Sequence, residues 1–160
     1  DLIGLGQLLS LSPSSELNML ACTRFRPDFR SNNLYSLPNQ KEQQLSDKHR
    51  ASHEHRGQPL GFPSRTYGQL ASVLAKGGSI RTTTLTSSFG WEDYQELHGS
   101  RATLLMAVDP RDWIHVASAE LSFTPGPDWV LLSLIEAQPA ESKPAEENSG
   151  KEKAKSDLPK

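Results

Sequence analysis

Apolar and polar positions follow their most regular pattern between residues 79 and 136. β-Branched residues alternate with their neighbours at the start of this region, and later apolar runs have the length of buried strands. Residues 109–112, Asp-Pro-Arg-Asp, predict a hairpin, because the fixed φ of proline suits the second position of a type I turn. Residues 125–128 predict a second turn. We therefore expect strands at residues 80–85, 102–108, 113–117 and 129–135.

A short helix is expected over residues 91–98. Gly90 precedes it at the N-cap position and Asp93 stands at its third position, where an acidic side chain can reach back to the cap. Gly99 follows where a left-handed residue commonly ends a helix. The order of elements in this region is therefore strand, helix, strand, strand and strand.

The start of the chain predicts a strand, a helix and a second strand. Residues 6–11 resemble a short buried strand, and Ser12 with Pro13 supplies an N-cap and a proline at the first helical position. Pro27 should kink or end the helix, because it lacks an N–H donor and its ring clashes with the preceding turn. The second strand is expected at residues 34–37. The apolar stripe of the helix is expected to comprise Leu17, Leu20, Ala21, Phe25 and Phe29.

Residues 39–65 are polar and rich in Gln, His, Arg and Pro, which predicts a linker. A helix should follow, because Thr66 and Gln69 have the spacing of a capping box and two glycines stand at positions 77 and 78. Its apolar stripe is expected to comprise Tyr67, Leu70, Ala71 and Leu74.

Together these elements predict an α/β segment followed by an α+β domain. The strand, helix and strand of residues 1–38 are typical of part of a parallel, doubly wound sheet. Residues 66–136 predict a small α+β domain with a mainly antiparallel sheet, separated from the first segment by the linker at 39–65. Residues 137–160 contain one large aliphatic side chain, Leu158, and no aromatic one, so this tail is expected to be disordered.

Charge and composition narrow the classes of function. A net charge of −2 argues against nucleic acid and anionic lipid as partners. The single cysteine, Cys22, cannot form an intramolecular disulfide, which is typical of a reducing compartment. No apolar run reaches the roughly 20 residues that a membrane-spanning helix needs, so we expect no direct membrane insertion.

Three histidines, His49, His53 and His55, are the one metal-like grouping in the sequence. The spacing of His49 and His53 would place two imidazoles on one helical face, with Glu54 nearby. This segment lacks the apolar periodicity that would fix ligand geometry, and it is not an HExxH motif. We therefore predict no metal site.

Motifs of catalysis are absent from the sequence, which has neither a GxSxG elbow nor a glycine-rich phosphate loop. Four titratable residues gather on the helix at 91–98: Glu92, Asp93, Glu96 and His98. Acidic residues in a first turn favour the helix dipole, and a protonated His98 in the last turn would do the same. We predict no enzyme activity, and ordinary NMR titrations of His98 and His115 would remove support for an acid–base pair.

The turn from the first strand into the first helix is the candidate ligand site. Doubly wound sheets bind ligands at the carboxyl ends of their strands, and a helix N-terminus offers unpaired N–H groups. An ordinary N-cap is the competing interpretation. The predicted ligand-binding residues are Ser12, Ser15, Glu16 and Asn18.

Tryptophans and arginines supply two candidate surfaces. The predicted interface residues are Trp91, Trp113 and Trp129. They lack the basic groove of a base-stacking platform, which favours packing in the core or at a protein interface. A second candidate surface for a membrane or a partner, beside the simpler interpretation of a solvated face, comprises Arg24, Arg26, Arg30, Arg50, Arg56 and Arg65.

The amino-acid sequence of residues 79–136 resembles that of a known family. The segments IRTTTLT, WEDY, LLMAVDP and PGPDWVLLSLI occur in this order. They are similar to the C-terminal cytosolic end of bacterial sodium/proton antiporters of the monovalent cation:proton type. The start of the chain, DLIGLGQLLSLSPSS with residues 34–38, resembles the last strand, helix and strand of the potassium-transport nucleotide-binding domain that precedes the terminal domain in these antiporters.

This resemblance implies a non-catalytic cytosolic regulatory domain that couples a cytosolic signal or partner to cation:proton exchange. It also implies a Rossmann-like fold for the first segment, the transmembrane antiporter domain of a parent protein as partner, a location at the cytoplasmic face of the cell membrane, and a homodimer. This chain would hold no cofactor, and a nucleotide would require sequence upstream of Asp1. The alternative hypothesis is a stand-alone protein-interaction module that docks through a strand edge or exposed tryptophans.

Overall fold

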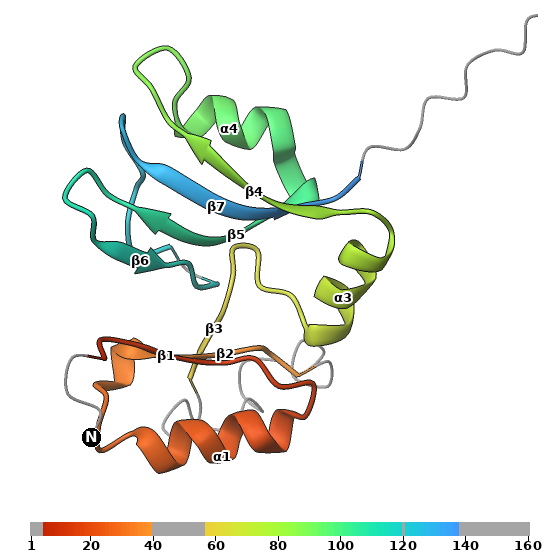
Figure 1. Ribbon diagram of the computed structural model, residues 1–160, viewed down its shortest axis with the longest axis vertical. Coiled ribbons are helices and arrows are strands. Elements are labelled where there is room, and N and C mark those ends of the chain that lie inside the picture. The colour runs from red at the N-terminus through yellow and green to blue at the C-terminus, as the bar shows by residue number, and fades with distance from the viewer. Residues whose placement is uncertain (1–4, 40–56, 120, 138–160) are drawn as a thin grey trace, which may run out of the picture.

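The computed structural model describes residues 5–39, 57–119 and 121–137 and contains two sheets (Figure 1). The first sheet has three parallel strands, in the order β1 (Leu8–Ser10), β2 (Leu34–Ser36) and β3 (Gln58–Pro59). The second has four antiparallel strands, in the order β4 (Ser79–Thr84), β7 (Val130–Ile135), β5 (Ala102–Val108) and β6 (Ile114–Val116). This architecture confirms the predicted fold class, an α/β segment followed by an α+β domain. The predicted tail and the three histidines of the metal-like grouping lie outside the described residues.

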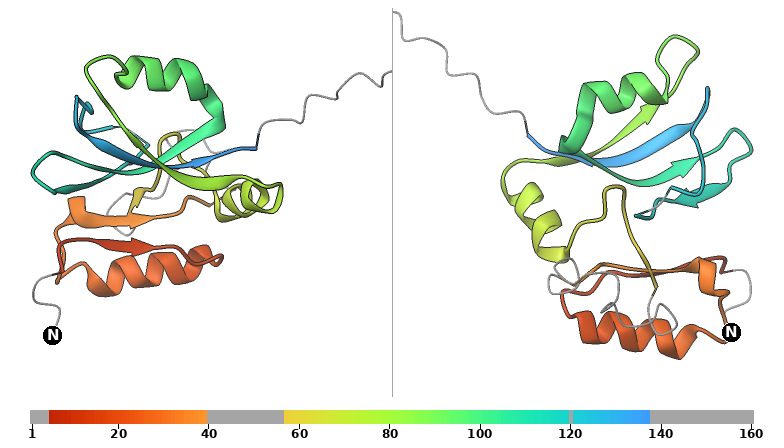
Figure 2. Two further views of the ribbon diagram at one scale, coloured as in Figure 1. Left: turned by 45° about the horizontal axis from the view of Figure 1, so that its top comes forward. Right: turned by 180° about the vertical axis from the view of Figure 1, so that it is seen from behind.

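The parallel sheet is built around a strand–helix–strand unit. β1 (Leu8–Ser10) leads into α1 (Ser15–Phe25), and the chain returns to β2 (Leu34–Ser36), in agreement with the predicted order. The two strands pair in parallel, with Leu9 opposite Tyr35. α1 covers the face of this sheet that points away from the antiparallel sheet (Figure 2).

The start of α1 differs from the prediction, whereas its end agrees. Ser14, not Ser12, is the N-cap, and its Oγ accepts a hydrogen bond from the N–H of Leu17 at 3.3 Å. The hydroxyl of Ser12 instead accepts a bond from the N–H of Ser14 at 3.1 Å and shapes the turn before the helix. The helix ends at Phe25, two residues before Pro27, as the missing donor of proline predicts.

The buried face of α1 also differs from the prediction. Asn18 and Cys22 are buried, whereas Leu17 and Leu20 of the predicted apolar stripe are 57% and 63% exposed. Residues four positions apart share one helix face, so Asn18 and Cys22 together define the side that packs on the sheet. The prediction was wrong at Leu17 and Leu20, because it counted apolar residues alone, whereas Phe29 of the predicted stripe is buried and Ala21 and Phe25 are half-buried.

Residues 57–65 differ from the expected linker. β3 (Gln58–Pro59) pairs with β2 and extends the parallel sheet. Leu60 then forms an antiparallel bridge to Ser118, just beyond a strand of the other sheet, and Phe62 forms one to Leu104 within that sheet. This segment therefore connects the two sheets through backbone hydrogen bonds, which its polar composition did not indicate.

α3 (Tyr67–Ala75) begins with the predicted capping box. Thr66 Oγ1 accepts a bond from the N–H of Gln69 at 3.3 Å, and Gln69 Oε1 accepts one from the N–H of Thr66 at 2.8 Å. The helix packs through Val73, which is buried, and Leu70, which is half-buried. The exposed members of the predicted stripe are Tyr67, Ala71 and Leu74.

The antiparallel sheet has the predicted order of strand, helix and three strands. β7 lies between β4 and β5, so the last strand that the structure describes is central in the sheet. β5 and β6 form the predicted hairpin, whose turn is closed by a 3.0 Å bond from the N–H of Asp112 to the carbonyl of Asp109. The elements are β4 (Ser79–Thr84), α4 (Trp91–His98), a 3-10 turn (Gly99–Arg101), β5 (Ala102–Val108), β6 (Ile114–Val116) and β7 (Val130–Ile135).

α4 starts and ends at the predicted residues. Asp93 Oδ2 accepts a bond from the N–H of Gly90 at 2.7 Å, which satisfies one N–H group at the helix start. Gly99 has a positive φ of 51°, but its ψ of −135° lies outside the left-handed helical region that was predicted. Glycine adopts this conformation more readily than any residue with a Cβ, so the residue type matches the position.

The main core lies between α4 and the antiparallel sheet (Figure 1). Leu85, Tyr94, Leu104 and Leu131 are each at most 3% exposed. Tyr94 reaches from α4 to the central strand, where its hydroxyl donates to Ser133 Oγ at 2.7 Å. Burial raises the pKa of the Tyr94 phenol above its usual value, and the bond to Ser133 partly offsets this effect.

A second apolar cluster joins the two sheets. Tyr35 and Leu37 contribute from the parallel region, Leu60 from the bridging segment, and Met106 and Val116 from the antiparallel sheet. The molecule is therefore layered in the order α1, parallel sheet, antiparallel sheet and α4 (Figure 2).

Candidate ligand-binding site

A cavity of about 500 Å³ lies at the carboxyl ends of β1 and β2. Its walls come from the turn into α1, the residues that follow β2, and the first turns of α3. Ser12, Ser15 and Asn18, three of the four predicted ligand-binding residues, line this cavity. Its position agrees with the rule that open α/β sheets bind ligands at the carboxyl ends of their strands.

Asn18 holds the turn between β1 and α1. Its Oδ1 accepts bonds from the hydroxyl of Ser10 at 3.0 Å and from the N–H of Ser12 at 2.8 Å. Its Nδ2 donates to the carbonyl of Ser12 at 2.9 Å. Because the side chain is only 3% exposed and already bonded on both ends, its amide positions Ser12 at the cavity wall.

Glu16, the fourth predicted residue, lies at a smaller cavity nearby. This cavity, of about 120 Å³, is also lined by Ser15 and Asn18. The carboxylate of Glu16 accepts a 2.9 Å bond from the hydroxyl of Ser14, and the hydroxyl of Ser15 accepts a 3.2 Å bond from the amide of Asn39. The four predicted residues therefore lie within one helical turn and its preceding loop, around two adjacent cavities.

α3 forms a wall of the larger cavity that the sequence prediction missed. Thr66, Tyr67 and Gly68 line it from the start of this helix. The capping box predicted the helix, but not that its first turn would face the first turn of α1. Several lining residues carry hydroxyl or amide groups, and none of those within residues 5–39 and 57–119 is Lys, Arg, His, Asp or Glu. The cavity therefore offers hydrogen bonds to a polar ligand, aided by two helix N-termini that favour negative charge.

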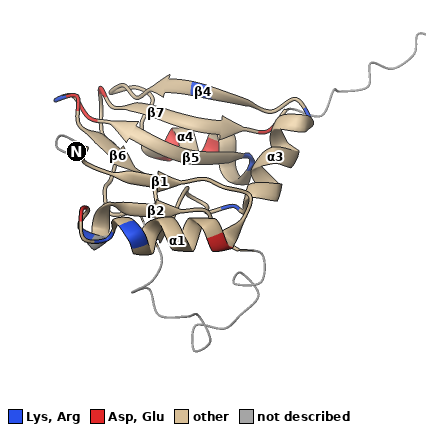
Figure 3. Ribbon diagram, turned by 60° about the horizontal axis from the view of Figure 1, so that its bottom comes forward, with Lys and Arg blue, Asp and Glu red and all other residues tan. Residues whose placement is uncertain are grey.

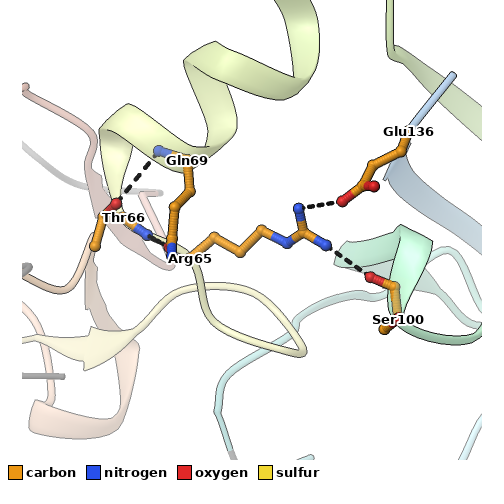
Figure 4. Close-up of polar contacts among 5 residues, drawn as sticks. All are labelled: Arg65, Thr66, Gln69, Ser100 and Glu136. Atoms are coloured by element: carbon orange, nitrogen blue, oxygen red, sulfur yellow. Dashed lines mark hydrogen bonds and ion pairs between the residues drawn. The ribbon is translucent and has the colours of Figure 1, made fainter. Parts of the chain in front are cut away.

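Arg65, the residue before the N-cap of α3, makes two polar contacts to other parts of the chain (Figure 4). Its Nη1 lies 2.6 Å from Glu136 Oε1, and its Nη2 donates to the carbonyl of Ser100 at 2.7 Å. The adjacent residue, Thr66, begins the capping box with Gln69, so the arginine and the helix start are held together. A cavity of about 290 Å³ adjoins this ion pair, and Gln69 lines both this cavity and the larger one.

The three predicted interface tryptophans have different surroundings. Trp91 stacks on Tyr94 at a centroid distance of 5.6 Å, beside the main core. Trp129 stacks on Phe123 at 5.7 Å and also packs beside that core. Trp113, next to the hairpin turn, is 69% exposed. Only Trp113 among the three is therefore strongly exposed.

In the turn of the β5–β6 hairpin, the carboxylate of Asp109 takes part in several hydrogen bonds. Burial acts to raise the pKa of Asp109, but bonds from the N–H groups of Trp113 and Arg111 and from the His115 ring outweigh it and hold the pKa below its usual value. The ring of His115 lies 3.2 Å from Asp109 Oδ2. These contacts close the turn, in agreement with the prediction that Asp109 is a turn residue.

His98, in the last turn of α4, has surroundings that disfavour its protonated form. Burial lowers the pKa of His98 below its usual value, and the positive charges of Arg101 and Arg81 lower it further. Its ring packs against Tyr94 at a centroid distance of 4.7 Å. The fold therefore favours the neutral imidazole rather than the protonated form.

Neither a metal cluster nor a reactive thiol is found in the part of the chain that the structure describes. No group of three or more His, Cys, Asp or Glu residues lies close enough there to hold a metal ion. Burial raises the pKa of the Cys22 thiol, and the opposing effects of Gly57, Arg26 and Ser36 are smaller. A thiol with a raised pKa is a poor nucleophile, so Cys22 is suited to packing.

Comparison with protein-family models, with curated proteins and with solved structures finds no match to this chain. Among the helices of residues 5–39, 57–119 and 121–137, none combines the length and apolar character needed to cross a bilayer.

Proposed function

We propose that this chain is a non-catalytic cytosolic regulatory domain of a sodium/proton antiporter, coupling a cytosolic signal or partner to monovalent cation:proton exchange. The single observation that supports it most is the cavity at the carboxyl ends of β1 and β2. Hydroxyl and amide groups line this cavity, and among the residues that the structure describes no acid, histidine or cysteine lines it. Such a lining suits binding of a polar ligand better than catalysis.

The position of the cavity provides a route for coupling. Its walls include residues of α1 and α3. Along the chain, α1 precedes and α3 follows the segment that connects the two sheets. A ligand that contacts both helices favours the arrangement in which they are close together. Such differential affinity is what a coupling free energy requires. The partner in this proposal is the transmembrane domain of the parent protein, and the assembly is a homodimer at the cytoplasmic face of the cell membrane.

The first test is the coding sequence upstream of Asp1. A series of apolar helices of about 20 residues each, followed by the remaining strands of a nucleotide-binding domain, would support the proposal. A start codon just before Asp1, in a gene that encodes no membrane-spanning segment, would overturn it.

A second test fills the cavity in the full-length protein. A Cβ at Gly68 meets no atom within 4 Å, so Gly68→Leu directs a side chain into open space at the cavity wall. We expect this change to alter how sodium/proton exchange in everted membrane vesicles responds to pH and to nucleotides. Gly6→Leu is the matched control, because Gly6 is equally open and does not line the cavity. Identical responses of both variants and the wild type to pH and every nucleotide would contradict the proposal.

A second candidate function, a stand-alone interaction module, is favoured by one observation. Trp113 and Ile114 are adjacent and are 69% and 56% exposed. Large exposed aromatic side chains are typical of residues that dominate binding energy at protein interfaces. Under this alternative, Trp113→Ser abolishes partner binding while changing the free energy of unfolding by less than about 0.5 kcal/mol.

A further inference from the structure

β4 forms an open edge of the antiparallel sheet (Figure 3). It pairs with β7 on one side, and no other described segment pairs with its outer side. Ile80 is 55% exposed, and most of the other side chains of this strand are exposed as well. An uncovered edge strand presents a row of backbone N–H and C=O groups that can pair with another chain.

The opposite edge of the sheet is better protected. β6 is a short strand of three residues. Just beyond it, the carbonyl of Ala117 accepts a 2.9 Å bond from the N–H of Gly61, and Ser118 bridges to Leu60. β4 has twice that length, a regular register, and no proline or bulge, so that the charge of Arg81 is the one usual edge-blocking device it carries.

The hydrogen bonds of β4 show which backbone groups point outward. The N–H of Leu85, directly after β4, donates to the carbonyl of Trp129 at 2.8 Å. In an antiparallel pair, every second residue directs its N–H and C=O at the partner strand, so Arg81 and Thr83 also bond to β7. The residues whose backbone groups point away from the sheet are therefore Ile80, Thr82 and Thr84.

We propose that a second copy of this chain occupies this edge, with the two β4 strands paired antiparallel about a two-fold axis at Thr82. Ile80 then lies opposite the partner's Thr84, and Thr82 lies opposite the partner's Thr82. Each outward N–H and C=O of these residues meets a complementary group. The two antiparallel sheets become one continuous sheet across the dimer.

Charge selects this register over its neighbour. Arg81 is the only charged residue of β4, and in the proposed pairing it lies opposite the partner's Thr83. Sliding one strand by two residues toward its start would place Arg81 opposite the partner's Arg81. Like charges directly opposite each other destabilise a strand pair, which disfavours the register with the two-fold axis at Arg81.

Composition favours a second β4 over another part of the same chain as the occupant. The two long stretches outside the described residues, 40–56 and 138–160, contain no Val, Ile, Thr, Phe, Tyr or Trp, the residue types that favour strands. β4 itself consists largely of such residues, and opposed threonines form favourable cross-strand pairs. This inference concerns the chain itself and does not rest on the antiporter assignment.

Sedimentation equilibrium of the full chain over a series of concentrations tests the proposal. We expect a reversible monomer–dimer equilibrium. Thr82→Lys places two ammonium groups opposite each other and should raise the dissociation constant of the dimer at least about tenfold. Thr82→Glu should do the same, and an equimolar mixture of the two variants should associate again, because opposite charges then meet. Ile114→Lys, on the exposed surface of the other edge strand, is the matched control and should leave the dissociation constant unchanged.

Amide hydrogen exchange of the wild type gives a second measurement that needs no substitution. Raising the concentration should slow exchange at Ile80, Thr82 and Thr84. Exchange at Arg81 and Thr83 should not change, because their N–H groups bond to β7 in the monomer as well. A wild type that is monomeric at every concentration, or a Thr82→Lys variant that dimerises like the wild type, would overturn the proposal.

Discussion

The antiparallel and parallel regions bury different kinds of side chain. In the antiparallel sheet Ala107 and Leu131 have no exposed surface and Leu104 is 1% exposed, although Thr103 and Ser133 are buried there as well. In the parallel region, α1 turns Asn18 and Cys22 toward the sheet and leaves Leu17 and Leu20 in solvent. The antiparallel region is thus stabilised mainly by its hydrophobic core, whereas α1 is held by a buried amide network. The two regions should respond to different substitutions.

The largest expected effect comes from the core of the antiparallel region. Leu131→Ala removes a fully buried side chain from the strand pair at the centre of the sheet, and we expect a loss of about 3 kcal/mol in the free energy of unfolding. Leu20→Ala, the same substitution at a position 63% exposed, should cost less than about 0.5 kcal/mol. Urea denaturation measures both. Equal losses for the two variants would contradict the contrast between the regions.

A smaller effect is expected from the amide network of the parallel region. Asn18→Ala removes three hydrogen bonds and leaves the N–H of Ser12 without this acceptor, so we expect a loss of about 2 kcal/mol. Met19→Ala, at the neighbouring and partly exposed position, should have little effect. Hydrogen exchange of the α1 amides reports on the parallel region. Tryptophan fluorescence reports on the antiparallel region, since all three tryptophans lie between residues 91 and 129.

The fluorescence of the Asn18→Ala variant sharpens the comparison. The shared cluster of Tyr35, Leu60 and Val116 joins the two regions. If this cluster makes unfolding cooperative, as we expect, the fluorescence transition shifts together with the exchange of the α1 amides. A fluorescence transition that does not move, beside faster exchange in α1, would mean that the regions unfold separately.

The smallest effect concerns acid stability and is confined to the antiparallel region. The pKa of His98 is lower in the folded state than its usual value of 6.5, so the unfolded chain binds the proton first as the pH falls. The resulting stability is present above pH 6.5 and is lost as the pH falls from 6.5 through the folded-state pKa. His98→Gln should remove this loss. Thermal unfolding of both proteins between pH 7.5 and about 5 measures it, and parallel pH profiles would contradict it.

Much of the antiparallel region could be predicted from sequence because local signals agree with the tertiary structure there. The strands, α4 and the hairpin turn are each specified by neighbouring residues. β3 could not be predicted in this way, since it has two residues and includes Pro59. It depends on Gly57, where a Cβ would lie 2.8 Å from the carbonyl carbon of Tyr35, and such a close approach is set by distant residues.

The candidate site was predictable only on its α1 side. The carboxyl end of β1 and the start of α1 are local features, and they pointed to Ser12, Ser15, Glu16 and Asn18. The opposite wall, from Thr66 to Gly68, follows them by about fifty residues in the chain and arrives there through the bridging segment. The polar groups of the cavity come in part from this second wall. The chemistry of the cavity could therefore not be predicted from the first segment alone.

Arg65 sets a limit on how the protein can be shortened. Its guanidinium contacts the carbonyl of Ser100 and the carboxylate of Glu136, the residue that directly follows β7. A fragment that stops at Ile135 would keep every described strand but lose this carboxylate. Truncations meant to preserve the seating of α3 should therefore retain Glu136.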